Sequence, residues 1–140
     1  MPQMPGFRSL NLEEQRFVEH AMQSGREVCT HYLGHEKRLS VPDDLDATYN
    51  AWAADPERNK PADNVVCYGL GALLGQRLVS DLGFQWCMEL AEDGEIYCVR
   101  HPKEWRIYPF DFVAKRIHER EPHGGFFRAI YEVLRKHNKT

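Results

Sequence analysis

The sequence lacks a hydrophobic run near the roughly 18–20 residues that a membrane-spanning helix requires. Its first residues, MPQMPGFRSLNLEEQ, contain neither the basic region nor the apolar stretch of a secretory signal peptide. A chain of 140 residues, 42% of them hydrophobic, suits one compact domain with a single core. We therefore expect a cytoplasmic protein with one domain over residues 1–140, in which residues 1–10 form a flexible segment.

Clustered metal ligands are also absent. The four cysteines are widely spaced and form no C-x-x-C pair, whereas a zinc site needs ligands at short spacing. His31 and His35 stand four residues apart, but Gly34 between them is expected to end a helix, and no Glu follows His31 as in a metalloprotease motif. We predict no metal and no cofactor. Reduced, mostly buried thiols are expected for all four cysteines: Cys29, Cys67, Cys87 and Cys98.

No catalytic motif is present either. The stretch Gly69 to Gly75 is similar to a phosphate-binding loop, but its third glycine falls one residue late for G-x-G-x-x-G. It also lies inside a predicted helix and does not open one after a strand. No serine or cysteine lies in a nucleophile-elbow context. The sequence therefore predicts no catalytic residue, and an enzyme is the less favoured hypothesis.

Hydrophobic periodicity predicts the order of the secondary structure. Three helices come first. One runs from Asn11, which is expected to form a capping box with Glu14, to Gly34; a short one, capped by Asp43 or Asp44, closes before Pro56; and an apolar one ends at Gly83. A β-meander follows, and two helices complete the chain after Pro109, the first of them expected to be capped by Asp111. The prediction is an α+β domain with a three-stranded antiparallel sheet packed against about five helices, in the order ααα-βββ-αα.

The meander is expected to begin with a hairpin whose three-residue loop is 92–94, with a glycine bulge at its end. That loop pairs Cys87 with Val99, and Met88 with Cys98. Cys87 and Cys98 are then not directly opposite, so no disulfide is expected between them.

The third predicted helix contains Gly69, Gly71 and Gly75. Each glycine inside a helix costs about 1 kcal/mol relative to alanine. Three of them in one buried helix indicate that another element approaches this backbone closely.

Between Val65 and Ile117 the sequence contains the patterns LGALLG, GFQW and PFD, together with the dipeptides HP and KR. This stretch, under half of the chain, resembles a bacterial family named domain of unknown function 3806. Members of that family show a Leu-Gly-x-x-Leu-Gly pattern, a Gly-x-x-Trp strand start and a Pro-Phe-Asp corner before a helix. The resemblance implies a bacterial source and a small soluble domain. Its residues are packing and turn residues, so it implies no catalytic position.

Charge is unevenly distributed: residues 1–63 carry seven basic and eleven acidic side chains, and residues 100–140 carry ten and five. Such polarity steers partners, or else the two ends attract one another within the fold. The leading hypothesis is a non-enzymatic protein-binding module. An immunity or antitoxin-like protein that covers a basic active site is one form of it. The expected partner surface is acidic: Asp43, Asp44, Asp46, Asp55 and Glu57.

The alternative hypothesis is a small-molecule-binding domain or weak enzyme, with a pocket between the glycine-rich helix and the sheet. The residues expected to line that pocket are Trp86, Tyr97, His101 and Tyr108.

Nucleic acid is not an expected partner, although the last third of the chain is basic. Glu119, Glu121 and Glu132 are interleaved with its basic residues, and the apolar residues of the last helix are needed for the core. Neither a nucleic-acid nor a membrane partner is predicted. The basic residues considered are Arg116, Arg120, Arg128, Arg135, Lys136 and Lys139.

Overall fold

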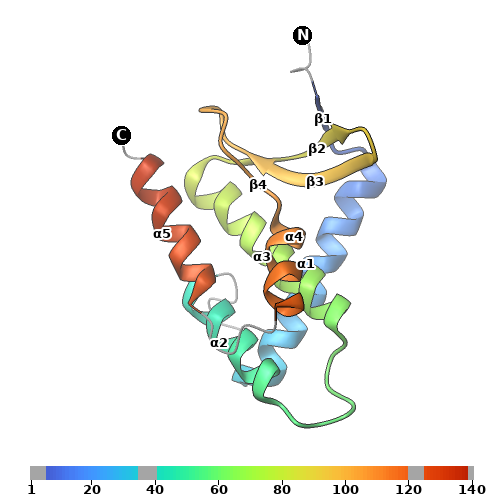
Figure 1. The fold of residues 1–140 in the computed structure, drawn as a ribbon, viewed down its shortest axis with the longest axis vertical. Coiled ribbons are helices and arrows are strands. Elements are labelled where there is room, and N and C mark those ends of the chain that lie inside the picture. Colours follow the sequence, from blue (N-terminus) through green and yellow to red (C-terminus); the bar gives the residue numbers. More distant parts are fainter. Residues whose placement is uncertain (1–5, 35–40, 120–124, 139–140) are drawn as a thin grey trace.

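The computed structural model describes residues 6–34, 41–119 and 125–138. Within them the chain forms five helices and a four-stranded antiparallel sheet, an α+β fold, with the sheet lying across one end of the helices (Figure 1). The elements are β1 (Phe7–Ser9), α1 (Leu12–Leu33), α2 (Pro42–Ala54), α3 (Asp63–Leu82), β2 (Gln85–Ala91), β3 (Gly94–Arg100), β4 (Arg106–Ile107), α4 (Pro109–His118) and α5 (Phe126–Asn138).

The sheet has one strand more than the sequence predicted. Its order is β1-β2-β3-β4, and β1 comes from the segment that was expected to be flexible. The predicted order ααα-βββ-αα, with no strand before residue 80, is therefore wrong at its start. β1 is held because Leu90 N donates to Gly6 O at 2.7 Å and because the Arg8 guanidinium pairs with Glu14 and Glu95. A strand of three residues is too short for its alternation to be recognised in a sequence.

The hairpin between β2 and β3 also differs from its predicted register. Ala91 pairs with Gly94, so the loop has two residues, and Cys87 lies directly opposite Cys98. The predicted three-residue loop shifted every pair by one position. An error of one residue in the register assigns every residue of the strand to the wrong cross-strand partner. For this reason the contact between Cys87 and Cys98 was not predicted.

The helix ends follow the sequence where a side-chain cap or a glycine fixes them. Asn11 and Glu14 form the predicted capping box, and Gly34 and Gly83 end α1 and α3 in the left-handed conformation, with φ of 74° and 77°. The helices α2 and α4 instead begin at a proline, ahead of the aspartates that were expected to cap them. A proline suits the first helical turn because its missing N–H would have no partner there.

The glycine-rich helix α3 is the centre of the fold, and every residue from Gly69 to Gly75 is buried. α1 crosses it where Gly25 meets Gly69: a Cβ on Gly69 would lie 2.7 Å from Gly25 Cα. On other sides of α3, a Cβ on Gly71 would lie 2.8 Å from the Phe110 ring, and one on Gly75 would lie 2.5 Å from the Trp86 indole. The predicted close approach is confirmed, and it involves three elements: α1, α4 and β2.

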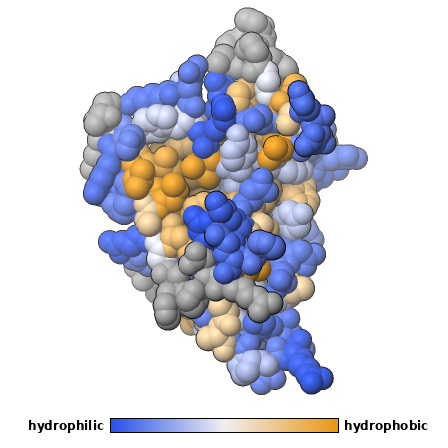
Figure 2. Space-filling model, viewed as in Figure 1, coloured by the Kyte–Doolittle hydropathy of each residue, from blue (hydrophilic) through white to orange (hydrophobic). Residues whose placement is uncertain are grey.

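On the face shown in Figure 2 the surface is largely hydrophilic, with apolar residues gathered on the side where α5 lies. α5 contributes the half-exposed Val133 to the surface of the molecule. Among the described residues, no helix combines the length and the apolar character needed to cross a membrane.

Asp46, a residue of α2, caps the N-terminus of α5. Its carboxylate accepts hydrogen bonds from the backbone N–H groups of Gly125, Phe127 and Arg128, at 2.8, 3.0 and 3.0 Å, and the residue is 8% exposed. This arrangement satisfies the N–H groups that a helix start leaves free, and it places a negative charge at the positive end of the helix dipole. Asp43, three residues earlier, pairs with the exposed Arg128 guanidinium at 3.0 Å.

We predict that Asp46→Ala lowers the free energy of unfolding by about 2–3 kcal/mol, because three buried or half-buried N–H groups lose their acceptor. Asp43→Ala is the matched control and should cost less than about 1 kcal/mol, because it removes only an exposed ion pair. Urea unfolding followed by circular dichroism measures both variants. Equal losses would contradict the capping role of Asp46.

Candidate functional site

One face of α1 follows the contact with α3 along the length of the helix. Phe17, Ala21, Ser24, Val28 and His31 recur at helical spacing, so they form a single stripe. Ala21 and Val28 are buried, whereas Phe17 and His31 are exposed. The stripe is thus buried in its middle and exposed at its two ends, which are an aromatic end at Phe17 and a polar end at His31.

The aromatic end is built from four rings. Phe17 packs against Tyr68 of α3, Tyr97 of β3 and Phe110 of α4, with ring centroids 5.4, 5.2 and 5.9 Å away. Tyr68 and Tyr97 also pack on Phe110, at 5.3 and 5.5 Å. Phe17 and Tyr68 remain 36% and 42% exposed. We call these four residues the aromatic cluster.

The polar end is a cavity of about 440 Å³ between α1, the loop after α2 and the start of α3. Val65 on its wall lies one helical turn before Tyr68, so the cavity and the aromatic cluster adjoin along α3. We call the two together the α1–α3 groove. The side chains of the cavity that carry or can carry charge are Glu27, His31, Asp55, Glu57 and Lys60.

Asp55 is fixed in this cavity by hydrogen bonds. Its carboxylate accepts from the backbone N–H of Glu57 at 3.0 Å and from the Tyr32 hydroxyl at 2.7 Å. These two bonds, the Glu57 N–H first, hold the pKa of Asp55 below its usual 3.8. Burial and the same carboxylate raise the pKa of Tyr32. Asp55 is therefore a fixed negative charge at neutral pH, and Tyr32 a fixed donor.

Lys60 binds the end of α2, and its charge also helps to lower the pKa of Asp55. Its ammonium donates to the Trp52 carbonyl at 3.0 Å and lies 4.7 Å from the centre of the Trp52 ring. The Trp52 indole in turn donates to Pro61 O at 2.8 Å. The positive charge is thus held against the end of α2, where the helix dipole is negative.

The five acidic residues predicted to form one partner surface do not lie together. Asp43, Asp44 and Asp46 belong to the first turns of α2, whereas Asp55 and Glu57 follow its last residue. Asp55, the C-cap of α2, follows Asp46 by nine residues and Asp43 by twelve, which corresponds to about 14–18 Å along the helix. Asp46 is buried beneath α5. Of the five acidic residues, only Asp55 and Glu57 line the cavity of the α1–α3 groove.

The four residues predicted to line one pocket do not converge either. Trp86 and Tyr97 share Phe110 as a neighbour, at 5.9 and 5.5 Å. The Tyr108 hydroxyl instead donates to Glu89 at 2.7 Å and accepts from the Arg106 side chain.

His101 is a structural residue at the end of β3. It is buried, and its ring stacks on Trp105 with centroids 4.8 Å apart. Its Nδ1 accepts from Lys103 N at 3.1 Å, so its Nε2 carries the proton and donates to Asn138 Oδ1 at 2.8 Å. With both nitrogens engaged, this histidine has no free position for a ligand.

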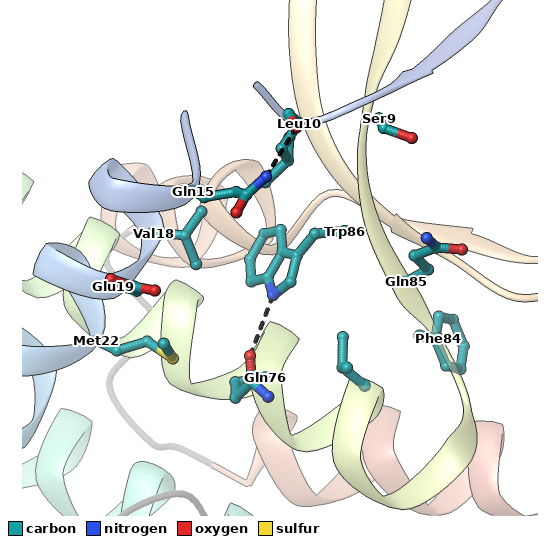
Figure 3. A pocket seen from close by; sticks show the side chains of 11 residues that line it. Ser9, Leu10, Gln15, Val18, Glu19, Met22, Gln76, Phe84, Gln85 and Trp86 are labelled. Atoms are coloured by element: carbon teal, nitrogen blue, oxygen red, sulfur yellow. Dashed lines mark hydrogen bonds between the residues drawn. The ribbon is translucent and has the colours of Figure 1, made fainter. Parts of the chain in front are cut away.

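A pocket does lie between the glycine-rich helix and the sheet, with Trp86 as the one predicted member. Its volume is about 370 Å³, and it lies between α1, α3 and the start of β2. Figure 3 shows the Trp86 indole directed into it, with Nε1 donating to Gln76 Oε1 at 3.4 Å. Apolar side chains that line it include Val18, Met22 and Phe84, and the polar lining residues are Ser9, Gln15, Glu19, Gln76 and Gln85.

Several predicted residues lie outside the described part of the chain: His35, Arg120, Glu121 and Lys139. Among the described residues, no group of three or more His, Cys, Asp and Glu side chains is placed to hold a metal ion. Arg128, from the basic C-terminal third, pairs with Asp43 of α2, which is an attraction within the fold.

Comparison with models of protein families, with curated proteins and with solved structures found no match for this chain. The similarity to domain of unknown function 3806 therefore stays a prediction.

We predict that Tyr32→Phe raises the pKa of Asp55 toward 3.8, because the carboxylate loses a donor. A depressed carboxylate pKa stabilises the fold above the unfolded pKa, and this contribution is lost as pH falls through the folded value. The variant should therefore lose less stability than wild type when the pH drops below 3.8.

Carbon-13 NMR titration of the Asp55 carboxyl measures the shift. Tyr131→Phe, which removes a similar bond to Asp81, is the control and should leave Asp55 unchanged. An identical Asp55 titration in Tyr32→Phe and wild type would contradict the assigned role of Tyr32.

Proposed function

We propose that this protein is a non-enzymatic protein-binding module, and that its binding surface is the α1–α3 groove. The observation that carries the proposal is the pair of exposed rings, Phe17 and Tyr68, next to a cavity that holds the fixed carboxylate of Asp55. Aromatic residues dominate the energy of protein interfaces, and they do so when they are central and well packed.

The aromatic cluster is suited to binding because its rings are already ordered. Phe17 touches three other rings and Tyr68 touches two, so neither side chain is free to adopt many rotamers. A partner that covers them gains apolar contact without a large loss of conformational entropy. Phe110 supports both rings from beneath and is itself seated on Gly71.

The cavity indicates the chemistry of the partner. Glu27, Asp55 and Glu57 bring three carboxylates to it, against Lys60, whose ammonium is bound to the end of α2. Complementary charge improves specificity and association rate. The partner that fits is a protein segment with a lysine or arginine next to an aromatic or aliphatic anchor.

An immunity or antitoxin-like protein that covers a basic active site is one form of this proposal, and it now rests on Asp55 and Glu57. Membership of the bacterial family that the sequence resembles, with a place in the cytoplasm, is also proposed. Packing supports that resemblance, because the three motifs contact one another: Gly75 of LGALLG lies against Trp86 of GFQW, and Gly71 lies against Phe110 of PFD.

A second function is proposed for the pocket at Trp86: it binds a small neutral ligand. Its volume of about 370 Å³ lies within the range of small-molecule sites, roughly 300–1,000 Å³. The indole offers a flat apolar surface, and the glutamine amides offer donors and acceptors without charge. The carboxylate of Glu19, which also lines the pocket, disfavours anionic ligands.

The groove is tested by selecting random-sequence displayed peptides on the wild-type protein. Enriched peptides should pair a lysine or arginine with an aromatic or aliphatic residue. A synthetic peptide from this set should bind about tenfold more weakly to Tyr68→Ala, since loss of an aromatic anchor costs upward of about 1.4 kcal/mol. Glu57→Lys should weaken binding as well, through charge repulsion.

Leu90→Ala is the matched control, because Leu90 is a similarly exposed apolar residue on β2, away from the groove. It should bind the peptide as tightly as wild type. Enriched peptides without a basic residue, or peptides whose NMR shift changes map away from α1 and α3, would rule out this binding surface.

The pocket is tested with benzamide, a neutral planar amide, and with benzoate, its anionic counterpart. We expect millimolar benzamide to shift the NMR signals of the Trp86 indole N–H and the Met22 methyl group. Benzoate should bind more weakly because of Glu19. Equal binding of the two probes, or shifts confined to other parts of the protein, would refute the proposed ligand class.

A further inference from the structure

Cys87 and Cys98 face each other across the β2–β3 hairpin. They are direct partners in the antiparallel register, and their Sγ atoms are 3.1 Å apart. Directly opposed residues in antiparallel strands have Cα atoms about 4.5–5.5 Å apart, which lies within the range of about 4.4–6.8 Å seen for disulfides. A bond between these sulfurs therefore requires an approach of about 1 Å and no new pairing of the backbone.

The two cysteines lie on the face of the sheet opposite the one from which Trp86 packs against α3. Residues two apart in a strand share a face, so Cys87 lies with Glu89, and Cys98 lies with Arg100. Phe7, opposite Glu89, shares this face. The Arg100 guanidinium lies 4.3 Å from the centre of the Phe7 ring. The Arg106 guanidinium also lies over this ring, 5.4 Å from its centre, so β1 and two arginine side chains lie on the same face as the pair.

The two thiols are not equivalent. Cys98 is fully buried, whereas Cys87 keeps 9% of its surface exposed. The hydrogen bond between the two thiols and the nearby Arg100 lower the pKa of Cys87, while the same bond and burial raise the pKa of Cys98. A thiolate, and not a thiol, attacks a disulfide, so Cys87 is the sulfur prepared to react first.

We propose that Cys87 and Cys98 form a reversible disulfide by exchange with a low-molecular-weight disulfide of the glutathione type, with Cys87 as the attacking residue. The Cys87 thiolate attacks one sulfur of the small disulfide, which gives a mixed disulfide and releases one small thiol. Cys98 then loses its proton and attacks Cys87 Sγ, which closes the protein disulfide and releases the second thiol. Two electrons pass from the protein to the small disulfide, and the two protein protons end on the released thiols.

The other two cysteines serve as internal controls. Cys29 is fully buried within α1, and burial raises the pKa of its thiol. The Cys67 thiol donates to Phe110 O at 3.2 Å, and burial raises its pKa to about 11. Neither has a reactive thiolate at neutral pH, so both should stay reduced while the hairpin pair oxidises.

The experiment equilibrates the full-length protein in buffers of graded oxidised-to-reduced glutathione ratio, followed by acid quenching, thiol alkylation and peptide mass mapping. We expect a species about 2 Da lighter, with one disulfide that joins the Cys87 and Cys98 peptides, and its complete reversal by reduced glutathione. Four alkylated thiols at every ratio, or a disulfide that includes Cys29 or Cys67, would overturn the proposal.

The order of attack is tested with Cys98→Ser and Cys87→Ser, each checked for native circular dichroism. In oxidised glutathione, Cys98→Ser should accumulate a glutathione adduct on Cys87 of about 305 Da, because the second step is blocked. Cys87→Ser should be modified at least about tenfold more slowly on Cys98. An adduct that forms faster on Cys98 than on Cys87 would overturn the assignment of Cys87 as the attacking sulfur.

Discussion

The backbone contact between Gly25 and Gly69 determines where the rest of the molecule lies. A side chain on either residue would overlap the other helix, since a Cβ at Gly25 would stand 2.4 Å from Gly69 O. Beside this close contact, residues of α1 and α3 line two cavities. One belongs to the α1–α3 groove, and the other is the pocket under β2. Both candidate sites are therefore lined by residues of the two helices that meet at Gly25 and Gly69.

The other two glycines of α3 extend this arrangement to the sheet. Gly75 accommodates the Trp86 indole and Gly71 accommodates Phe110, so β2 and α4 pack directly on the helix backbone. Trp86 then forms a wall of the pocket, and Phe110 forms the floor of the aromatic cluster. A helix that forgoes up to about 3 kcal/mol of propensity at three glycines thereby positions both sites.

Much of this could be predicted from the sequence where one residue fixes a local conformation. The capping box at Asn11, the glycine ends of α1 and α3, and the close approach to α3 were all read correctly. The prediction failed where contacts between residues far apart in the sequence determine the structure. β1 has no pattern of its own and depends on Arg8, whose partners Glu14 and Glu95 lie 6 and 87 residues away. Asp46 looked like a surface carboxylate because its partners, 79 to 82 residues later, are backbone groups of α5.

The cysteine pair shows how one local choice changes a chemical conclusion. The sequence Glu92-Asp93-Gly94 is compatible with a two-residue or a three-residue loop, and periodicity along each strand is the same in both. Register, however, decides whether Cys87 meets Val99 or Cys98. With the two-residue loop, the two thiols are neighbours at 3.1 Å, on the face of the sheet opposite Trp86. The alternation of side chains along a strand determines which face of the sheet a residue occupies. The length of the hairpin loop determines which residue lies opposite it, and the proposed reaction of Cys87 with Cys98 depends on that length.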